Sequence, residues 1–198
     1  MPIKPILFNT EMVRAILDGR KSCTRRLVKF FSGENPRWSG YIKDGLMLYN
    51  GKNEPCIRKA PYQPGDILYV RETFIQAAAH IFWYKANDKP WMSKGLRWKP
   101  SIHMPKEAAR IWLKVTDVRV ERLQDVTEDG AKAEGAIDNR GFIHSPENEY
   151  DRIHTAREHF IKIWNSTVKK SDLDRYGWSA NPYVWVIEFE RCEKPEGV

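Results

Sequence analysis

The order of apolar and polar positions predicts a strand and then a helix at the start of the chain. Ile3 to Phe8 is a short apolar run of the kind that forms a buried strand. Thr10 can cap the helix that follows, and Gly19 can end it. The apolar residues expected on one face of this helix are Met12, Val13, Ile16 and Leu17.

Three further strands are predicted in the middle of the chain. Pro64-Gly65-Asp66 is a turn signal, and Ile67 to Glu72 follows it as a strand. Ile81 to Tyr84 is a second candidate. Ile111 to Leu123 is the longest, and its apolar positions change from odd to even numbers. That change predicts a bulge near Asp117, or two strands meeting there.

The last third of the chain predicts two helices and a closing strand. Thr127 can cap a small helix that ends near Gly135. A longer helix is expected over roughly 152–166, and Tyr183 to Glu190 alternates as a strand. The apolar stripe of the longer helix would consist of Ile153, Ala156, Phe160 and Trp164.

Short strands, two firm helices and no strand–helix–strand repeat predict an α+β domain around a small barrel. At 198 residues the chain fits a single domain, residues 1–198. Long insertions are expected at about 30–60, 74–110 and 136–181. The first of these, rich in Gly, Asn, Pro and Lys, predicts an irregular segment or a weak hairpin.

Charge is spread unevenly along the sequence. Residues 1–120 hold 22 Lys/Arg and 10 Asp/Glu, whereas residues 121–198 hold 11 and 16. A basic first part suits a polyanionic partner, although ordinary surface charge for solubility is an alternative. Residues 85–114 combine eight Lys/Arg with Trp91, Trp98 and Trp112. Such a stretch can bind phosphates and stack bases, but a loop with core anchors has the same composition.

The sequence predicts no metal site, no cofactor and no membrane span. The cysteines, Cys23, Cys56 and Cys192, are far apart, so we expect reduced thiols and a cytoplasmic protein. His154 and His159 are five residues apart, a spacing that disfavours a shared metal ion on a helix. No apolar run approaches the roughly 18 residues that a span needs.

Residues 19–26, Gly-Arg-Lys-Ser-Cys-Thr-Arg-Arg, hold the densest candidate chemistry. Four cations, hydroxyl groups and a thiol follow the glycine that ends the first helix. This segment therefore combines a nucleophile with a candidate base, and its cations suit an anionic or planar polar ligand.

In order along the chain, these motifs resemble the ASCH domain, which is similar in fold to the small RNA-associated PUA β-barrel. The matching blocks are a helix followed by Gly19-Arg20-Lys21-x-x-Thr24-Arg25, then Pro64-Gly65-Asp66 before a strand ending at Arg71-Glu72, and then a long strand before a Thr-capped helix. The first 28 residues are especially close to ASCH proteins of bacteriophages and prophages. Together the blocks cover a little under half of the chain.

The resemblance implies a cleft that binds RNA or a modified nucleoside. One branch of the family hydrolyses N4-acetylcytidine with a Lys, a Thr and a Glu, which match Lys21, Thr24 and Glu72. The residues expected to contact the nucleic acid or nucleoside are Arg20, Arg25, Arg26, Arg71, Lys94, Arg97, Trp98 and Lys99. The chain is about twice as long as those enzymes, which leaves its substrate open.

Amide hydrolysis sets conditions on these three residues. Thr24 can supply the nucleophile, and Lys21 can act as base in its neutral form, which burial or nearby cations favour. Glu72 can act as acid if apolar surroundings keep it protonated. Lys21 and Thr24 point to opposite faces of a regular strand, so they converge only if Lys21 lies in the preceding turn or a bulge intervenes.

Other functions remain open at this point. The protein is alternatively a non-catalytic RNA-binding module, a metal-independent ribonuclease, or a phage factor that acts on a host protein through its acidic C-terminal part. The residues themselves have ordinary alternatives. Lys21 can be a solvated turn residue, Thr24 a plain strand residue, and Glu72 a surface partner of Arg25, Arg26 or Arg71. Arg25 can equally be part of a structural ion pair.

Overall fold

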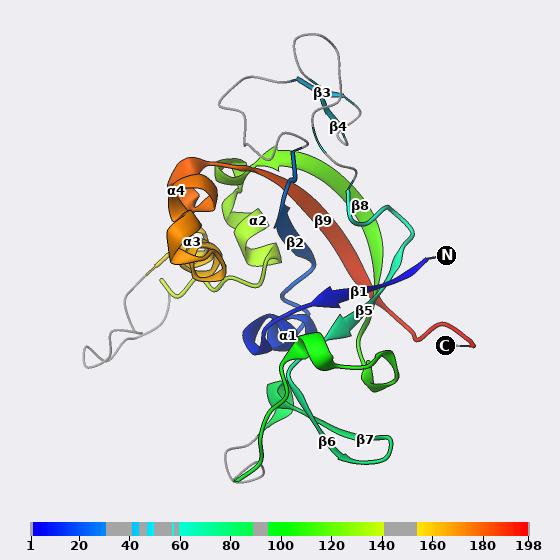
Figure 1. Ribbon diagram of the computed structural model, residues 1–198. Coiled ribbons are helices and arrows are strands. Elements are labelled where there is room, and N and C mark those ends of the chain that lie inside the picture. Colours follow the sequence, from blue (N-terminus) through cyan, green and yellow to red (C-terminus); the bar gives the residue numbers. More distant parts are fainter. Residues whose placement is uncertain are drawn as a thin grey trace, which may run out of the picture. The chain divides into compact units, whose positions relative to one another are not determined.

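The computed structural model describes residues 2–30, 41–43, 47–49, 57, 60–88, 95–140 and 154–197 (Figure 1). Its strands are β1 (Ile3–Leu7), β2 (Cys23–Leu27), β3 (Tyr41–Lys43), β4 (Met47–Tyr49), β5 (Ile67–Arg71), β6 (Phe74–Ala78), β7 (Ile81–Tyr84), β8 (Trp112–Arg122) and β9 (Tyr183–Cys192). Its helices are α1 (Thr10–Leu17), α2 (Glu128–Ala133), α3 (Ala156–Thr167) and α4 (Leu173–Tyr176), with short 3₁₀ helices between elements. This content confirms the α+β class.

Five strands form one sheet in the order β1–β5–β8–β9–β2. β1 pairs with β5 in parallel, from Ile3 opposite Ile67 to Leu7 opposite Arg71. β5 then pairs antiparallel with β8. Since β1 and β2 lie at the two ends of this order, the described strands form an open sheet, whereas the sequence predicted a small barrel.

Contacts within the chain divide it into two compact units. Unit 1 comprises Met1–Ser22, Tyr62–Thr116 and Glu188–Val198, and unit 2 comprises Cys23–Pro61 and Asp117–Ile187. β8 and β9 each contribute residues to both units. The single domain expected from the sequence stays a prediction.

The buried side of β8 changes where the chain passes from unit 1 to unit 2. Leu113 and Val115 are buried in the first part of the strand, and Val118 and Val120 are buried in the second. The predicted change of face is therefore confirmed. The structure accommodates it within one strand of 11 residues instead of two strands that meet near Asp117.

Helix α1 and the turn after it belong to unit 1. The side-chain oxygen of Asn9 accepts a hydrogen bond from the backbone N–H of Met12 at 2.9 Å, so Asn9 is the N-cap. The prediction that Thr10 caps this helix is wrong by one residue, because Thr10 is already helical. Gly19 has a φ of 73°, which ends the helix as predicted. The helix buries Val13, Ala15 and Ile16.

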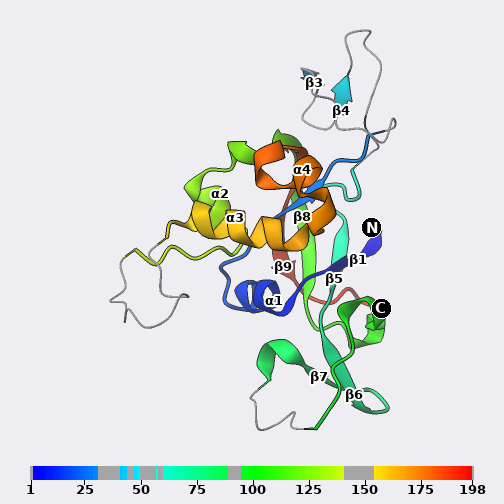
Figure 2. The same cartoon turned by 60° about the vertical axis from the view of Figure 1, so that its left-hand side comes forward.

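Unit 1 also contains a separate two-stranded hairpin made of β6 and β7 (Figures 1 and 2). The strand expected at Ile81 to Tyr84 is thus confirmed as β7. One side of the hairpin packs on a small apolar cluster of its own. The buried members of this cluster are Phe74, Met104 and Ala108, and Phe82, Tyr84 and Ala109 pack against them.

In unit 2, helix α2 begins at its predicted cap and helix α3 begins close to its predicted start. Thr127 caps α2, and its hydroxyl accepts a hydrogen bond from the N–H of Gly130 at 3.0 Å. Thr155 and Glu158 form a capping box at the start of α3, which begins four residues later than expected. The buried side chains of α3 are Ala156, Phe160 and Trp164, which confirms the predicted stripe, except that Ile153 lies outside the described residues.

Within the region 32–60 of unit 2, β3 pairs antiparallel with β4, which confirms the weak hairpin. Of the helices in the described ranges, none has both the length and the apolar character that crossing a membrane requires.

Candidate functional site

The turn between α1 and β2 places Lys21 ahead of the strand. The backbone N–H groups of Arg20 and Lys21 both donate to the carbonyl oxygen of Ala15, at 2.8 and 3.0 Å. β2 starts only at Cys23. The turn that the catalytic hypothesis requires before the strand is therefore present.

Lys21 is buried, with 4% of its surface exposed. Its Nζ lies 5.4 Å from the centroid of the Phe8 ring. Phe8 is itself buried, and its backbone N–H donates to the carbonyl oxygen of Arg71, the residue before Glu72. The alternative of a solvated turn lysine is thus wrong. Within unit 1, Phe8 thus contacts Lys21 through its ring and Arg71, the residue before Glu72, through its backbone.

Glu72 is buried as well, and a guanidinium binds both of its oxygens. Nε of Arg110 donates to Oε1 at 2.8 Å, and Nη2 donates to Oε2 at 2.9 Å. Glu72 is 1% exposed, so the pair is largely shielded from water on the carboxylate side. The alternative of a surface pair with Arg25, Arg26 or Arg71 is therefore wrong. The surroundings of Glu72 are also not the purely apolar ones expected from the sequence, because they include the guanidinium of Arg110.

Arg110 is held in place by two further contacts. Its guanidinium lies 4.0 Å from the ring centroid of Tyr84, and Nη2 also donates to Oδ1 of Asn87 at 3.1 Å. The hydroxyl of Tyr84 donates to the carbonyl oxygen of Ala108 at 2.8 Å. Burial raises the pKa of Tyr84, Arg110 opposes this rise, and Glu72 adds to it. Sequence reasoning missed Arg110 and Tyr84, and no local pattern marks either residue.

Thr24 and Arg26 form a contact within unit 2. Thr24 is 1% exposed, and its hydroxyl oxygen accepts a hydrogen bond from Nη1 of Arg26 at 3.0 Å. The same nitrogen donates to the carbonyl oxygen of Arg25 at 3.2 Å. Thr24 belongs to unit 2, whereas Lys21 and Glu72 belong to unit 1. A single catalytic site made of all three residues stays a prediction.

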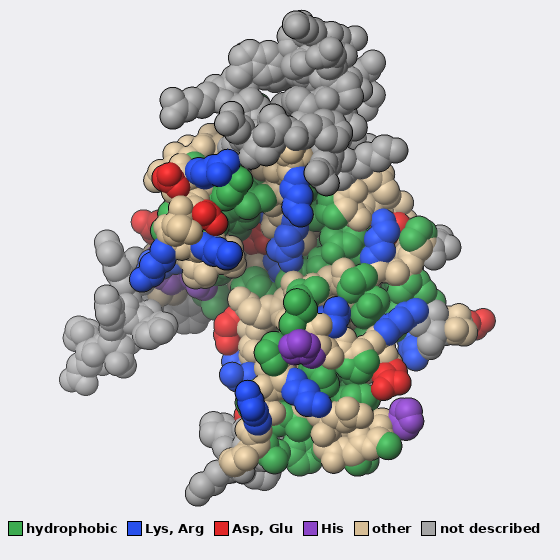
Figure 3. Space-filling model, viewed as in Figure 1, with side chains coloured by type: hydrophobic (Ala, Val, Ile, Leu, Met, Phe, Trp, Pro, Cys, Tyr) green, Lys and Arg blue, Asp and Glu red, His purple; other side chains and the backbone are tan. Residues whose placement is uncertain are grey.

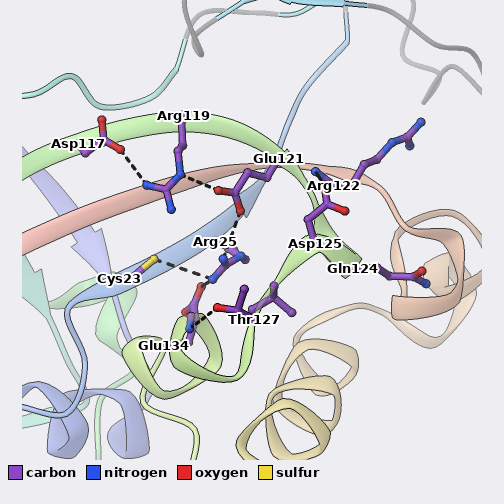
Figure 4. Close-up of polar contacts among 12 residues, drawn as sticks. Cys23, Arg25, Asp117, Arg119, Glu121, Arg122, Gln124, Asp125, Thr127 and Glu134 are labelled. Carbon is purple, nitrogen blue, oxygen red and sulfur yellow. Dashed lines mark hydrogen bonds and ion pairs between the residues drawn. The ribbon is translucent and has the colours of Figure 1, made fainter.

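Arg25 lies in a buried network of unit 2 (Figure 4). Its Nη1 donates to Glu134 at 3.3 Å, and its Nη2 donates to Glu121 at 3.4 Å. Glu121 also accepts from Arg119 at 2.6 Å, and Arg119 bonds to Asp117 at 2.8 Å. These contacts confirm the alternative that Arg25 is part of a structural ion pair.

Arg25 makes two further contacts, one with a sulfur atom and one with an aromatic ring. Its Nη1 lies 4.0 Å from the sulfur of Cys23, and its Cζ lies 5.8 Å from the ring centroid of Phe160. The Arg25 side chain is 3% exposed. Because its side chain is buried, the guanidinium of Arg25 is not accessible to a polyanion in solution.

Apart from Arg25 and Arg26, the described residues predicted to bind nucleic acid belong to unit 1 and are more accessible than Arg25. Arg20 is exposed and pairs with Asp18 at 2.9 Å. Arg71 donates to the carbonyl oxygen of Ile102. The remaining three described residues in this set are the exposed Arg97 and Lys99 and the half-buried Trp98, whereas Lys94 lies outside the described residues.

The tryptophans of the basic stretch separate into different roles. Trp112 is 4% exposed and therefore belongs to the core, as does Trp185 of β9. Trp98 keeps part of its surface, and Trp91 lies outside the described residues. Trp83 precedes the stretch, and sequence reasoning missed it, yet 40% of it is exposed.

Seven polar or charged side chains are buried in the described residues. They are Lys21, Thr24, Arg25, Asp66, Glu72, Glu134 and Asn139. The three candidate catalytic residues are all among them. Within the described ranges, no three His, Cys, Asp or Glu side chains are grouped so that they could hold a metal ion.

Folding reduces the charge asymmetry of the sequence. Unit 1 contains 15 Lys/Arg and 10 Asp/Glu, and unit 2 contains 18 and 16, so their net charges are +5 and +2. The acidic C-terminal residues join unit 1, and basic residues 23–61 join unit 2. Figure 3 accordingly shows Lys and Arg side chains at several separate places on the face that it draws.

Comparison with known proteins gives two structural likenesses. The chain is similar to the crystal structure of an ASCH domain from Lactobacillus crispatus JV V101, with a TM-score of 0.43, 13% identity, and coverage of 96% of this chain and 79% of that one. It is also similar to the hypothetical protein PH0355, with a TM-score of 0.37, 16% identity, and coverage of 97% and 100%.

Both TM-scores lie below 0.5, so neither likeness assigns the chain to a family. No family model matches the sequence, and no curated protein matches it either.

Proposed function

We propose that this protein binds RNA or a modified nucleoside, and that it is a member of the ASCH family that its motifs resemble. The observation that carries the proposal is the burial of Lys21, Thr24 and Glu72, which are 4%, 1% and 1% exposed. Burying charged groups is costly, so their presence inside the fold favours a role in binding or catalysis. The net charge of +5 on unit 1, which holds Lys21 and Glu72, suits an anionic ligand.

As the finer proposal, the protein hydrolyses an N4-acyl amide of cytidine. The hydroxyl oxygen of Thr24 attacks the acyl carbonyl carbon while Lys21 takes the hydroxyl proton. Glu72 protonates N4 as the bond from carbon to N4 breaks, which releases cytidine and leaves the acyl group on Thr24. Water then attacks this ester and gives one proton to the Glu72 carboxylate. Lys21 returns its proton to the Thr24 oxygen as the ester bond breaks, and the carboxylic acid leaves.

The contact with Arg110 sets a condition on the role of Glu72. Arg110 occupies both carboxylate oxygens of Glu72, so Glu72 must release at least one of these contacts before it can donate to N4. An oxygen released in this way can instead accept an N–H of a bound base. The observed geometry thus supports ligand binding more directly than it supports acid catalysis.

The finer proposal is tested with N4-acetylcytidine and chromatographic detection of cytidine. Lys21→Met, Thr24→Val and Glu72→Gln preserve side-chain size, and each should slow release at least about 100-fold if the residue is catalytic. Lys29→Met is the matched control, because Lys29 is an exposed lysine close by in the sequence. If all three variants release cytidine at the wild-type rate, the catalytic assignment is wrong.

Labelled single-stranded RNA separates the remaining functions. Retention that weakens steeply with salt indicates a non-catalytic binding module. Cleavage without added metal indicates a ribonuclease. Failure to bind either RNA or the nucleoside would overturn the proposed function as a whole.

A further inference from the structure

The β6–β7 hairpin has one packed face and one open face. Phe82 and Tyr84 of β7 point to the packed face, where they contact the apolar cluster around Phe74. Ile81 and Trp83 alternate with them and therefore point the other way. They are 53% and 40% exposed. The hairpin thus presents large apolar side chains to solvent.

A third segment adds to the hairpin along the free edge of β6. Lys99 forms an antiparallel bridge with Phe74, and the two exchange backbone hydrogen bonds at 2.8 and 3.2 Å. Phe74 in turn lies opposite Tyr84 in β7. These three residues therefore form one row on the packed face, and the Nζ of Lys99 lies 5.9 Å from the Phe74 ring centroid.

The neighbouring row belongs to the open face. Ile75 lies opposite Trp83. The bridge between Phe74 and Lys99 is a single antiparallel pair, and in its direction Trp98 is the residue next to Ile75 on the side away from Trp83. Antiparallel spacing over two strands then separates Trp83 and Trp98 by roughly 10 Å. Ile75 is 8% exposed, whereas Trp83 and Trp98 both keep accessible surface.

Exposed apolar side chains are frequent in the segment that contains this hairpin. Among the described residues, seven large hydrophobic side chains are exposed, and four of them, Ile81, Trp83, Leu96 and Ile102, lie between residues 81 and 102. Ile81 and Trp83 share one face of β7, and adjacent exposed apolar side chains are typical of an interaction surface.

The side chains in and beside the hairpin carry a net positive charge, which favours an anionic partner. The described residues 73–88 and 95–103 contain Lys85, Arg97 and Lys99 but only one acid, Asp88. The backbone N–H of Lys85 donates to the carbonyl oxygen of Thr73 at 3.0 Å, so Lys85, the first residue after β7, stays next to the start of β6. In the part of Figure 3 where Figure 1 draws the hairpin, hydrophobic, Lys, Arg, His and acidic side chains all reach the surface. Exposed tryptophans next to cations suit the bases and phosphates of a single strand.

We propose that the open face of the β6–β7 hairpin, together with Trp98, binds single-stranded RNA. Bases stack on Trp83 and Trp98, and Lys85 and Arg97 contact the phosphates. This inference rests on the proposed function and adds a contact surface that does not include Lys21, Thr24 or Glu72. Single strands are favoured over a duplex, because only unpaired bases offer their faces to aromatic rings.

The test measures binding of a fluorescently labelled oligouridine by anisotropy, with a duplex RNA of the same length for comparison. Trp83→Ala and Trp98→Ala should each raise the Kd for the single strand about tenfold, the size typical of one stacked base. Trp83→Phe should keep most of the affinity. Ile137→Ala removes an equally exposed apolar side chain from unit 2 and should leave the Kd unchanged.

The cations give a second measurement. Lys85→Ala and Arg97→Ala should each lower the dependence of log Kd on log salt by about one phosphate contact. Thermal unfolding of every variant shows whether it has kept the fold. Because the four side chains are accessible, we expect melting temperatures close to the wild-type value.

Three outcomes would contradict the proposal that the open face of the hairpin binds single-stranded RNA. If both tryptophan variants bind like wild type while Lys21→Met weakens binding, the hairpin is not the RNA surface and the proposed function stands. If the wild-type protein binds no single-stranded RNA, the proposal for the hairpin and the RNA part of the proposed function are both wrong. The nucleoside part of the proposed function is tested separately, by deacylation of N4-acetylcytidine. If Trp83→Ala changes only self-association in sedimentation, the face binds a second copy.

Discussion

Each unit has a cluster in which an arginine meets buried carboxylate groups, but the two clusters differ in geometry. In unit 1, Arg110 contacts both oxygens of Glu72 at 2.8 and 2.9 Å and stacks on Tyr84 at 4.0 Å. In unit 2, Arg25 makes single contacts of 3.3 and 3.4 Å to two different glutamates. Its Nε is buried and has no hydrogen-bond partner among the described residues.

The two arginines thus differ in how many carboxylates they contact: an arginine is called committed here if it binds one carboxylate and shared if it binds more than one. Arg110 is committed to one carboxylate, in the bidentate geometry that gives the strongest pairs. Arg25 is shared between two carboxylates, a sulfur and an aromatic ring, so each contact is weaker. Among the side chains that the structure describes, Glu72 therefore depends on Arg110 alone, whereas Arg25 depends on several residues. Four measurements test this difference between the two arginines.

The largest effect is expected for Arg110→Met. It leaves the carboxylate of Glu72 buried and unpaired, which should lower the free energy of unfolding by about 3–5 kcal/mol. Denaturant unfolding measures this change. The double variant Arg110→Met/Glu72→Met removes both charges and should recover most of the loss. If the double variant is as unstable as the single one, the cost comes from packing and not from the unpaired charge.

Arg25→Met should cost less, about 2–3 kcal/mol, because Glu121 is partly exposed and keeps its bond to Arg119. The same unfolding measurement applies. Combining Arg25→Met with Glu134→Gln should restore part of the stability, since Glu134 is the more buried of the two carboxylates. A loss equal to that of Arg110→Met would contradict the contrast between shared and committed arginines.

Thr127→Ala should lower stability by about 1 kcal/mol, the usual cost of losing an N-cap. Glu134 is the C-cap of helix α2, so a frayed α2 also loosens the carboxylate that contacts Arg25. The cost should therefore be non-additive with Arg25→Met and additive with Arg110→Met. Double-mutant cycles in chemical denaturation measure both couplings. Equal coupling to the two arginines would show that α2 does not act through Glu134.

The smallest effect is a pH dependence that only the unit 1 cluster should show. Burial raises the pKa of Tyr84 in the folded protein, so the unfolded chain loses the phenolic proton first. The contribution to stability is complete below the ordinary tyrosine pKa of about 10 and is lost as the pH rises through the higher folded value.

Unfolding free energies of wild type and Tyr84→Phe, measured from about pH 8 to 11, test this dependence. The difference between the two proteins should stay constant up to about pH 10 and then shift against the wild type. Phe160, the aromatic partner of Arg25, cannot ionise and provides no counterpart in unit 2. A constant difference across the whole range would exclude a raised pKa for Tyr84.

The elements of this fold were predictable because their signals are local. The cap at Thr127, the stripe of Phe160 and Trp164, and the change of face in β8 depend on residues within a few positions of one another. The error at the first helix was equally local, because Asn9 and Thr10 are both good caps and the backbone uses the earlier one.

The candidate site was predictable only in part. Lys21, Thr24 and Glu72 were chosen by motif, and all three prove to be buried. Their partners were not foreseen, because Arg110 is 38 residues from Glu72, and Glu134 is 109 residues from Arg25. The sequence likewise favoured Arg25 for binding and passed over Trp83, although Arg25 is buried and Trp83 is exposed.

The linear pattern alone located most of the helices and strands, their apolar faces, and the short segment that concentrates cations and hydroxyl groups. Periodicity and capping act over one or two turns of chain, so a linear pattern contains them. The folded structure was needed to show which carboxylate each arginine contacts, which tryptophans keep accessible surface, and how charge divides between the units. Ion pairs and burial depend on distances of a few ångströms between segments far apart in the chain, and packing alone sets those distances.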